Sequence, residues 1–244
     1  MTAVKCNNSA MALPPTLVRA NHSEFVYRQK SGPASSNLKL LTYGTYELGL
    51  AAESDELCQP YEETLLFCLN GLVEATIDKK KYQLKHYDLV YIPRGTSYRL
   101  RNIKACAEAK LVICKAPAEH RHPIYMAHWE AVRKNKKRIR LLKGKKVYLM
   151  FDVGEAADRL VAGYTIYEPH SRAYPPHNHT DQEEIYIFPQ GHGAIEVYAN
   201  EESKTFVHSL DPGDAVTIPV LNYHPVFSQE EELHFIWCIA GERY

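Results

Sequence analysis

The sequence lacks three features that would assign it at once to a class of protein: net charge, long apolar runs and paired cysteines. Lys plus Arg and Asp plus Glu both number 29, so nothing global draws the chain to nucleic acid or to an anionic membrane. No apolar run approaches the roughly 20 residues that a membrane-spanning helix needs. Residues 1–17 have no apolar centre, so we expect no secretory signal.

The six cysteines form no Cys-x-x-Cys pair, and several lie inside apolar runs. This pattern favours buried free thiols in a reducing compartment, so we expect a cytoplasmic protein. The chain has 244 residues, of which 45% are hydrophobic and 24% charged. It is therefore long enough for one large globular domain or two small ones.

Short runs of strand-forming residues alternate with turn signals through residues 38–116 and again through residues 146–244. Asn70-Gly71, between two such runs, predicts a tight hairpin because both residues tolerate positive φ. Short, evenly spaced strands without helical periodicity predict an all-β fold, either a sandwich or a barrel.

These signals divide the chain into four parts. We expect an N-terminal arm at residues 1–30, a first β domain at 31–118, a basic linker at 119–146 and a second β domain at 147–244. The basic run at residues 133–138 has two interpretations. It is either a solvated face of the linker or a patch that holds an anionic substrate or a neighbouring subunit.

The two β domains are copies of one another in sequence. Residues 88–98 (DLVYIPRGTSY) align without gaps with residues 214–224 (DAVTIPVLNYH), and the turn glycine Gly71 matches Gly191. A duplicated β unit is the economical explanation.

Residues 174–186 (YPPHNHTDQEEIY) of the second copy combine three metal-binding side chains. His177 and His179 face the same way on an extended chain, and Glu184 can join them from the next strand. His224, beyond the following Pro, supplies a fourth ligand. Three imidazoles and a carboxylate suit one divalent metal ion, zinc in the first place, with manganese and iron as alternatives.

The first copy has no equivalent ligand set, so we expect it to be structural. At the four ligand positions the alignment places Leu57, Gln59, Thr64 and Tyr98.

The remaining histidines are weaker candidates. His120 and His122 also have His-x-His spacing, but no acidic residue follows at ligand distance, so we expect no metal site there. We expect core or surface roles for the others, which lie in or beside predicted strands: His86, His208 and His234.

The complete pattern is His-x-His, four residues, Glu, six residues, Gly, and later Gly, five residues, Pro, four residues, His224. It resembles both cupin motifs, with departures at Ser171, Leu221 and Ser228 that touch no ligand. The resemblance implies two tandem cupin barrels, that is, double-stranded β-helices or jelly rolls, of which the first is degenerate.

The flanking residues narrow this resemblance. Residues 174–179 (YPPHNH) with 183–186 (EEIY) are similar to the signature of 5-deoxy-glucuronate isomerases, and residues 235–242 (FIWCIAGE) to the end of 5-keto-4-deoxyuronate isomerases. The two groups form one bicupin family. Membership implies a metal-dependent aldose–ketose isomerase of a sugar acid, and a homo-oligomer. The mixed flanks leave the sugar open.

Three residues are candidates for proton transfer or substrate binding beside the metal. Tyr186 shares strand parity with the glutamate ligand, and Tyr223 precedes the last histidine ligand, so either can move a proton. Arg172 can bind a substrate carboxylate with two hydrogen bonds. Ordinary packing or a surface position is the alternative for each. Glu183 alternates away from the glutamate ligand, so we expect it to point outward.

Two other functions are open on the same scaffold. One is an iron- or manganese-dependent dioxygenase, and the other is a module that binds a sugar acid without turnover. We expect a small-molecule substrate, with neither nucleic acid nor a membrane as partner.

Overall fold

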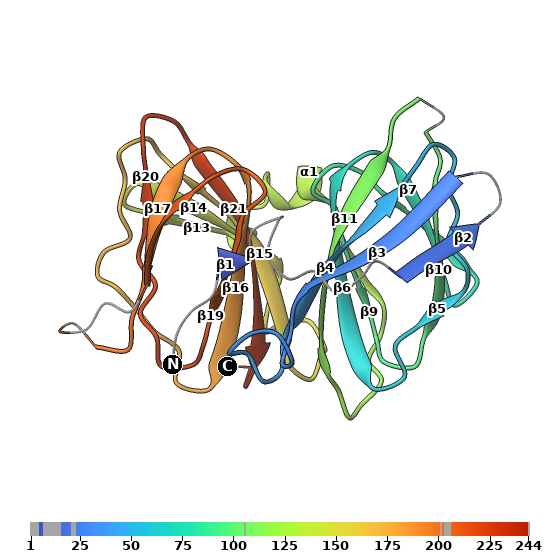
Figure 1. Cartoon of the computed structure of the whole chain (residues 1–244), viewed down its shortest axis with the longest axis horizontal. Coiled ribbons are helices and arrows are strands. Elements are labelled where there is room, and N and C mark those ends of the chain that lie inside the picture. The colour runs from blue at the N-terminus through green and yellow to red at the C-terminus, as the bar shows by residue number, and fades with distance from the viewer. Residues whose placement is uncertain are drawn as a thin grey trace.

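The computed structural model describes residues 5–6, 16–20, 23–104, 106–200, 202 and 206–243. Almost all regular structure is β, and it forms two barrels that lie side by side (Figure 1). The strands up to residue 127 are β1 (Lys5–Cys6), β2 (Thr16–Ala20), β3 (Ser23–Ser31), β4 (Thr42–Leu48), β5 (Leu57–Cys58), β6 (Glu62–Asn70), β7 (Val73–Ile77), β8 (Lys80–Leu84), β9 (Leu89–Ile92), β10 (Ser97–Asn102), β11 (Ala109–Pro117) and β12 (Tyr125–Ala127).

Two short helices, α1 (Trp129–Val132) and η1 (Lys136–Arg138), follow β12. The later strands are β13 (Ile139–Leu142), β14 (Lys145–Phe151), β15 (Leu160–Tyr167), β16 (Gln182–Gln190), β17 (Gly193–Val197), β18 (Phe206–Leu210), β19 (Ala215–Ile218), β20 (Val226–Ser228) and β21 (Leu233–Gly241). The predicted all-β fold of two tandem barrels is confirmed.

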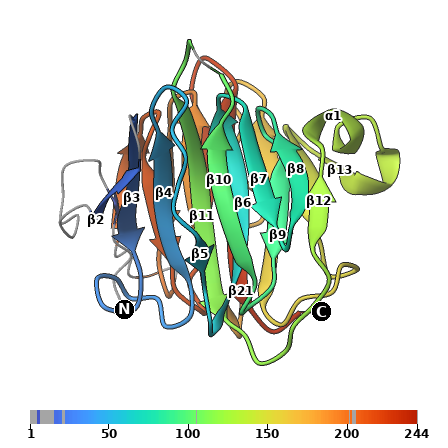
Figure 2. The same cartoon turned by 90° about the vertical axis from the view of Figure 1, so that its right-hand side faces the viewer.

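The burial of each strand follows its place in the barrels. In β10 the residues alternate between exposed and buried, because one face of the strand meets water. The central strands β6 and β9 are buried along almost their whole length. One of their faces fills their own barrel, and the other belongs to the apolar cluster shared with the second barrel. Figure 2 shows the first barrel in front of the second.

The sheet orders show the duplication directly. The large sheet of one barrel runs β12-β9-β6-β11-β4-β3-β2, and that of the other runs β1-β19-β16-β21-β15-β14-β13. Each strand of the first list has its counterpart at the same place in the second. The small sheets, β5-β10-β7-β8 and β18-β17-β20, match in the same way except for the added β5.

The two copies exchange their leading strands. β1 precedes the first copy but pairs with β19 of the second barrel, and β12 precedes the second copy but pairs with β9 of the first. Of the described strands of the predicted arm (residues 1–30), β1 and β2 are therefore sheet edges, whereas β3 pairs with β2 on one side and with β4 on the other. The predicted linker (119–146) contributes one strand to each barrel, β12 and β13.

The largest apolar cluster lies in the seam between the barrels and draws residues from both. Cys114 of β11 and Cys238 of β21 occupy equivalent places in the two copies, and their thiols meet there. Burial, together with this contact, raises the pKa of the Cys238 thiol well above its usual range. The cysteines whose side chains are described are free, as predicted; the side chain of Cys6 lies outside the described residues.

Glu183 joins the two barrels across this seam. Its carboxylate accepts hydrogen bonds from the backbone N–H groups of Lys39 (2.7 Å), Leu40 (2.5 Å) and Leu41, which lead into β4 of the other barrel. Its strand parity is as predicted, but the expectation that it points outward is wrong, because the side chain is only 3% exposed. The face of β16 opposite its own barrel interior is covered by the first barrel.

Glu63 makes the reciprocal contact from the first barrel. Its carboxylate accepts the backbone N–H groups of Asp158 (2.9 Å), Arg159 (2.7 Å) and Leu160 (2.8 Å), which lead into β15. The hydroxyl of Tyr91 also donates to it at 2.8 Å. We call the two sets of contacts the carboxylate clasps. Because each barrel gives the same type of contact to the other, the two barrels are arranged like the subunits of an isologous dimer, in which equivalent surfaces face one another.

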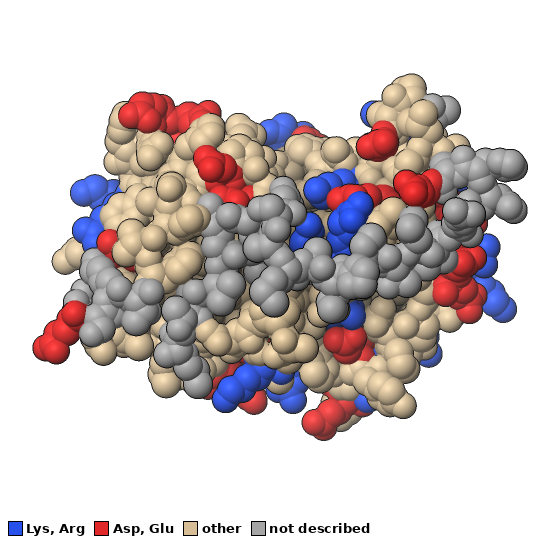
Figure 3. All heavy atoms as spheres, in the orientation of Figure 1, with Lys and Arg blue, Asp and Glu red and all other residues tan. Residues whose placement is uncertain are grey.

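The outer surface carries both signs of charge. On the face shown in Figure 3, basic and acidic side chains are interspersed, in keeping with a formal net charge of zero. Within the described part of the chain, no helix is long and apolar enough to cross a membrane.

We predict that Glu183→Gln lowers the free energy of unfolding by roughly 1.5–3 kcal/mol, because the new amide N–H group faces a backbone N–H donor where a carboxylate oxygen accepted one. Glu63→Gln should act in the same way from the other side. Glu62→Gln is the control, since this carboxylate forms only a partly exposed pair with Lys115 at 3.0 Å and should matter by less than about 1 kcal/mol. Urea unfolding measures all three, and equal losses would contradict the clasp.

Candidate metal centre

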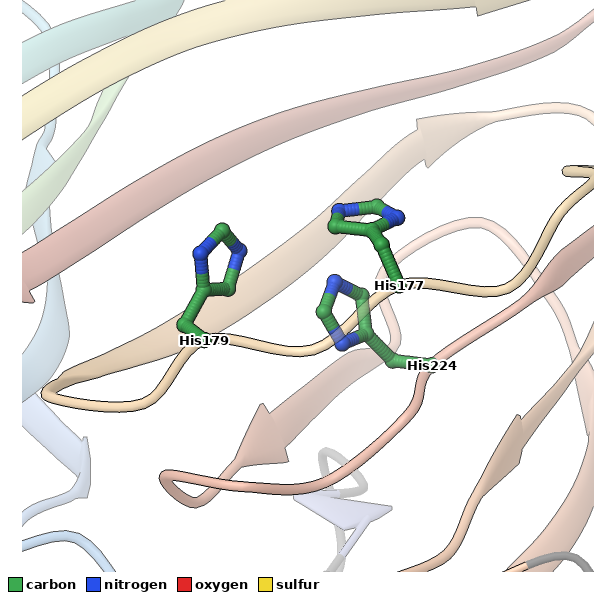
Figure 4. A group of neighbouring side chains, drawn as sticks. All are labelled: His177, His179 and His224. Atoms are coloured by element: carbon green, nitrogen blue, oxygen red, sulfur yellow. The ribbon is translucent and has the colours of Figure 1, made fainter.

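The four predicted metal ligands come from three segments of the second barrel. His177 and His179 lie on the loop between β15 and β16, Glu184 lies in β16, and His224 lies between β19 and β20. Figure 4 shows the three imidazole rings close together above the strands. Because neighbouring residues of a strand face opposite ways, Glu184 points into the barrel while Glu183 enters the seam.

The structure brings all four ligands together. The three histidines each offer a ring nitrogen within 4.8 Å of the others. Glu184 lies to one side of this group, with its Oε2 3.2 Å from Nε2 of His224 and 3.4 Å from Nε2 of His179. His177 is exposed, His179 half-buried and His224 buried, so the group runs from solvent into the barrel.

The atoms that meet here fit a cation. Nε2 of His179, Nε2 of His224 and Oε2 of Glu184 are buried and have no hydrogen-bond partner. Each such group costs about 1–3 kcal/mol if left unsatisfied, and one divalent ion would satisfy all three. Nδ1 of His224 lies 3.0 Å from the carbonyl oxygen of Asn222, and donating there leaves Nε2 with its lone pair free for a metal.

The pKa shifts favour the ligand forms of two of these groups. Although His177 as a residue is exposed, its ring is partly desolvated by the protein atoms around it. This desolvation, assisted by the neighbouring His224, lowers the pKa of His177 to about 4, so the imidazole is neutral at pH 7. Burial acts to raise the pKa of Glu184, but the adjacent imidazoles of His179 and His224 outweigh it and lower the pKa to about 2. For His179 the Glu184 carboxylate outweighs burial and raises the pKa, so metal binding there competes with a proton.

A cavity of about 460 Å³ opens over the ligands. Its wall includes Tyr186 and Trp237 of the barrel interior. Its charged lining is mostly basic, with Glu184 as the one acidic residue among those described. The basic side chains come from β13, β14, the turn between them and the loop before β16: Arg140, Lys143, Lys145 and Arg172.

Of the three residues predicted to act in proton transfer or substrate binding, two line the cavity and one does not. Arg172 lines the cavity, and its guanidinium lies 5.0 Å from the centre of the Phe227 ring. Tyr186 also lines it; burial, and then the charge of Glu184, raise its pKa well above 10, so it is a hydrogen-bond donor. Tyr223 is not among the lining residues, and its ring stacks on Tyr198 with 5.5 Å between centroids.

Lys145 is a cavity residue that the sequence analysis did not identify. Its Nζ donates to the hydroxyl of Tyr167 at 3.1 Å, and burial lowers its pKa although the charge of Glu184 opposes this. Lys145 fell inside the predicted linker because the strand was expected to begin later. Lys145 is two residues before Val147 and four before Leu149, so in a strand it faces inward with them. This alternation is the sequence signal that would have placed Lys145 in the cavity.

The first barrel is closed where the second is open. The carboxylate clasps align Leu41 with Leu160, so Tyr46 of β4 has the place of Thr165 in β15. The hydroxyl of Tyr46 lies 2.9 Å from that of Tyr98, the residue aligned with the last histidine ligand, and both tyrosines are buried. Large side chains fill the first interior at positions where the second has a cavity.

The basic run at residues 133–138 does not line the cavity. Arg133 and Lys134 pair with Glu130 at 3.0 and 3.5 Å, and Arg138 pairs with Glu155. These contacts support the interpretation of the run as a solvated face whose charge is partly neutralised by its neighbours.

The other histidines of the barrels have local partners. His86 stacks on Tyr87 with 3.7 Å between centroids, and Nδ1 of His234 lies 2.9 Å from the Tyr164 hydroxyl. His208, in β18, lies beside the ring of Phe206.

Comparison with known proteins gives a family and a fold. A protein-family model described as the KduI/IolB family matches residues 16–244. No curated protein sequence matches the chain significantly.

Among solved structures, an IolB-like protein from Salmonella typhimurium LT2 superimposes with a TM-score of 0.74 at 15% identity, over 100% of this chain and 94% of that one. A candidate glyoxylate-induced protein from Pseudomonas aeruginosa gives 0.75 at 12% identity, over 93% and 85%. Oxalate decarboxylase from Bacillus subtilis, for which Mn(II) centres are described, gives 0.76 at 12% identity, over 100% and 78%. These likenesses show that the barrels have the predicted cupin fold.

We predict that the purified protein carries a divalent metal ion at these ligands and that His224→Ala abolishes binding there, because the variant loses the buried nitrogen opposite Glu184. His208→Ala, which removes a histidine of β18 outside the group, should keep the metal. Elemental analysis after dialysis, with circular dichroism to verify folding, measures both. A folded His224→Ala protein that binds as much metal as wild type would show that the ligand assignment is wrong.

Proposed function

Because the chain belongs to the KduI/IolB family, we propose that it is a metal-dependent aldose–ketose isomerase that acts on a sugar acid, a deoxy-uronate or a related compound. Members of this family are sugar isomerases, which supports an enzyme. One observation carries the proposal for this chain. Three imidazoles and a carboxylate lie together, and His179, His224 and Glu184 each have an unsatisfied buried atom. The group opens to a cavity whose other charged lining residues, among those described, are cations.

The metal is part of the proposal. His177, His179, Glu184 and His224 would hold it, and zinc, manganese and iron all accept this mixture of nitrogen and oxygen ligands. When bound, such an ion acts as a Lewis acid towards a carbonyl oxygen and a neighbouring hydroxyl. We take zinc as the first candidate.

The isomerisation itself needs a group that moves a proton between adjacent carbons. We assign this role to Lys145, which lines the same cavity as the ligands. Burial lowers its pKa, which makes the neutral amine, the form that accepts a proton, easier to reach than for an exposed lysine. The Tyr167 hydroxyl, 3.1 Å away, holds the amine in position. Tyr186 can donate a hydrogen bond to a sugar oxygen from the cavity wall.

The basic lining supports an anionic substrate. Arg172 and Arg140 can each bind a carboxylate with two parallel hydrogen bonds, and the ring of Phe227 supports the guanidinium of Arg172. Phe235 and Trp237 form part of the apolar wall and help to exclude water from the reacting carbons. A neutral sugar would leave these cations without a partner.

We expect the metal-loaded protein to convert a deoxy-uronate in a panel of acidic and neutral sugars, and to lose this activity when a chelator removes the metal. NMR of the sugar follows the change from aldose to ketose. Oxygen uptake with Fe²⁺ would instead point to a dioxygenase, and tight binding of a sugar acid without product would point to a binding module. Either of these two results, without isomerisation of any sugar acid, contradicts the proposal.

We further expect Lys145→Met to lower kcat by roughly 10²–10⁴, the usual contribution of an acid–base group, while the bound metal is retained. Lys145→Arg should be nearly as slow, because it keeps the positive charge but cannot release its proton. Lys146→Met is the matched control, since the neighbouring side chain is exposed on the other side of β14. A Lys145→Arg variant with wild-type kcat would show that only the charge matters.

A further inference from the structure

A second cluster of metal-binding side chains lies at the seam, outside the cavity. His120 and His122 follow β11 of the first barrel, and Asp158 precedes β15 of the second. Oδ1 of Asp158 lies 2.6 Å from Nε2 of His122 and 3.2 Å from Nδ1 of His120. No acidic residue follows this His-x-His pair at ligand distance in the sequence, but the fold brings one to it. The carboxylate comes from a loop that the chain reaches 36 residues later.

The backbone fixes the orientation of this carboxylate. The N–H groups of Glu119 and His120 donate to Oδ2 of Asp158 at 2.5 and 2.8 Å. That oxygen is thereby satisfied, and Oδ1 is directed at the two imidazoles. The N–H of Asp158 itself donates to Glu63 in one of the carboxylate clasps. Asp158 is thus fixed by hydrogen bonds to its side chain and to its backbone in the absence of any bound ion.

The histidine segment is anchored as well. The N–H of Ala118 donates to the carbonyl oxygen of Tyr61 at 2.9 Å. The guanidinium of Arg94 donates to the carbonyl oxygens of Ala118 and Glu119 at 2.7 and 3.0 Å. The chain that carries the two imidazoles is consequently tied to the first barrel immediately before them.

We propose that His120, His122 and Asp158 form a second binding site for a divalent transition-metal ion of the zinc class. Two imidazole nitrogens and one carboxylate oxygen are a common ligand set for such ions, with water at the fourth position. Ligands of a tetrahedral zinc ion lie about 3.3 Å apart, given bond lengths of about 2.0 Å. The present distances of 2.6 and 3.2 Å need only small side-chain movements.

The position of the site makes it a link between the copies. His120 has a side chain that is 73% exposed, which gives an ion a path from solvent, while Asp158 is 13% exposed and contacts the other barrel. A bound ion would join the end of the first copy to the loop that Glu63 holds. The clasps align Asp158 with Lys39, so the equivalent place at the other side of the seam has a cation and we expect one such site per chain.

The test is a zinc titration of protein stripped of metal, with a chromophoric chelator as competitor. We expect two zinc ions per wild-type chain, one in His122→Ala and one in a variant that combines His177→Ala with His224→Ala. Zinc should also raise the unfolding midpoint of this double variant, and His122→Ala added to it should abolish both the binding and the shift. Because the double variant lacks the cavity site, the result is independent of the proposed function.

His128→Ala is the matched control, since His128 contacts one carboxylate, Asp88 at 3.2 Å, and its loss should leave the stoichiometry unchanged. Asp158→Asn gives a second measurement, because the amide oxygen can keep the backbone contacts while the ligand charge is lost. If the double variant binds no zinc, or if folded His122→Ala binds as much as wild type, the three side chains make hydrogen bonds only and the proposal is wrong.

Discussion

The carboxylate clasps are the constraint on which the rest of this structure depends. Each buries a glutamate between two barrels and satisfies it with three backbone N–H groups of the other copy. A buried carboxylate without such donors would be strongly unfavourable, so the clasps favour the docking register seen here over others. Since strand neighbours face opposite ways, the clasp that holds Glu183 in the seam also directs Glu184 at the three histidines of the candidate metal centre. One face of β16 therefore contacts the first barrel through Glu183, and the opposite face carries Glu184 of the candidate metal centre.

The duplication explains which residues the two copies share. Two pairs of equivalent positions in the seam carry the same residue, Cys114 with Cys238 and Glu63 with Glu183, as suits a surface that packs against its own copy. The barrel interiors have no such restriction. There, a hydrogen-bonded pair of tyrosines fills the first interior, and Thr165 with His224 leaves space in the second.

The parts of the site that could be predicted are those set by local geometry. His177, His179 and Glu184 follow from strand parity and one short turn, and the repeat located His224. Contacts between segments far apart in the sequence could not be predicted in this way. The barrel that covers Glu183, like the loop that brings Asp158 to a His-x-His pair, approaches from a distant part of the chain. A position next to a candidate ligand in the sequence was also a poor guide to a position in the cavity. Tyr223 directly precedes His224, yet it stacks on Tyr198 and does not line the cavity.

A net charge of zero conceals how charge is distributed near the candidate metal centre. Arg140, Lys143 and Lys145 all belong to the hairpin of β13 and β14, which closes one wall of the cavity, and Arg172 faces them from a loop. The total charge does not determine the field inside a cleft, because that field is set by the walls of the cleft. Among the described lining residues, four cations face one carboxylate, so an anion would enter favourably even without the charge that a metal would add. The same hairpin begins in what resembles a basic linker, so a segment that looked like a connection between domains supplies most of the surface that would recognise the substrate.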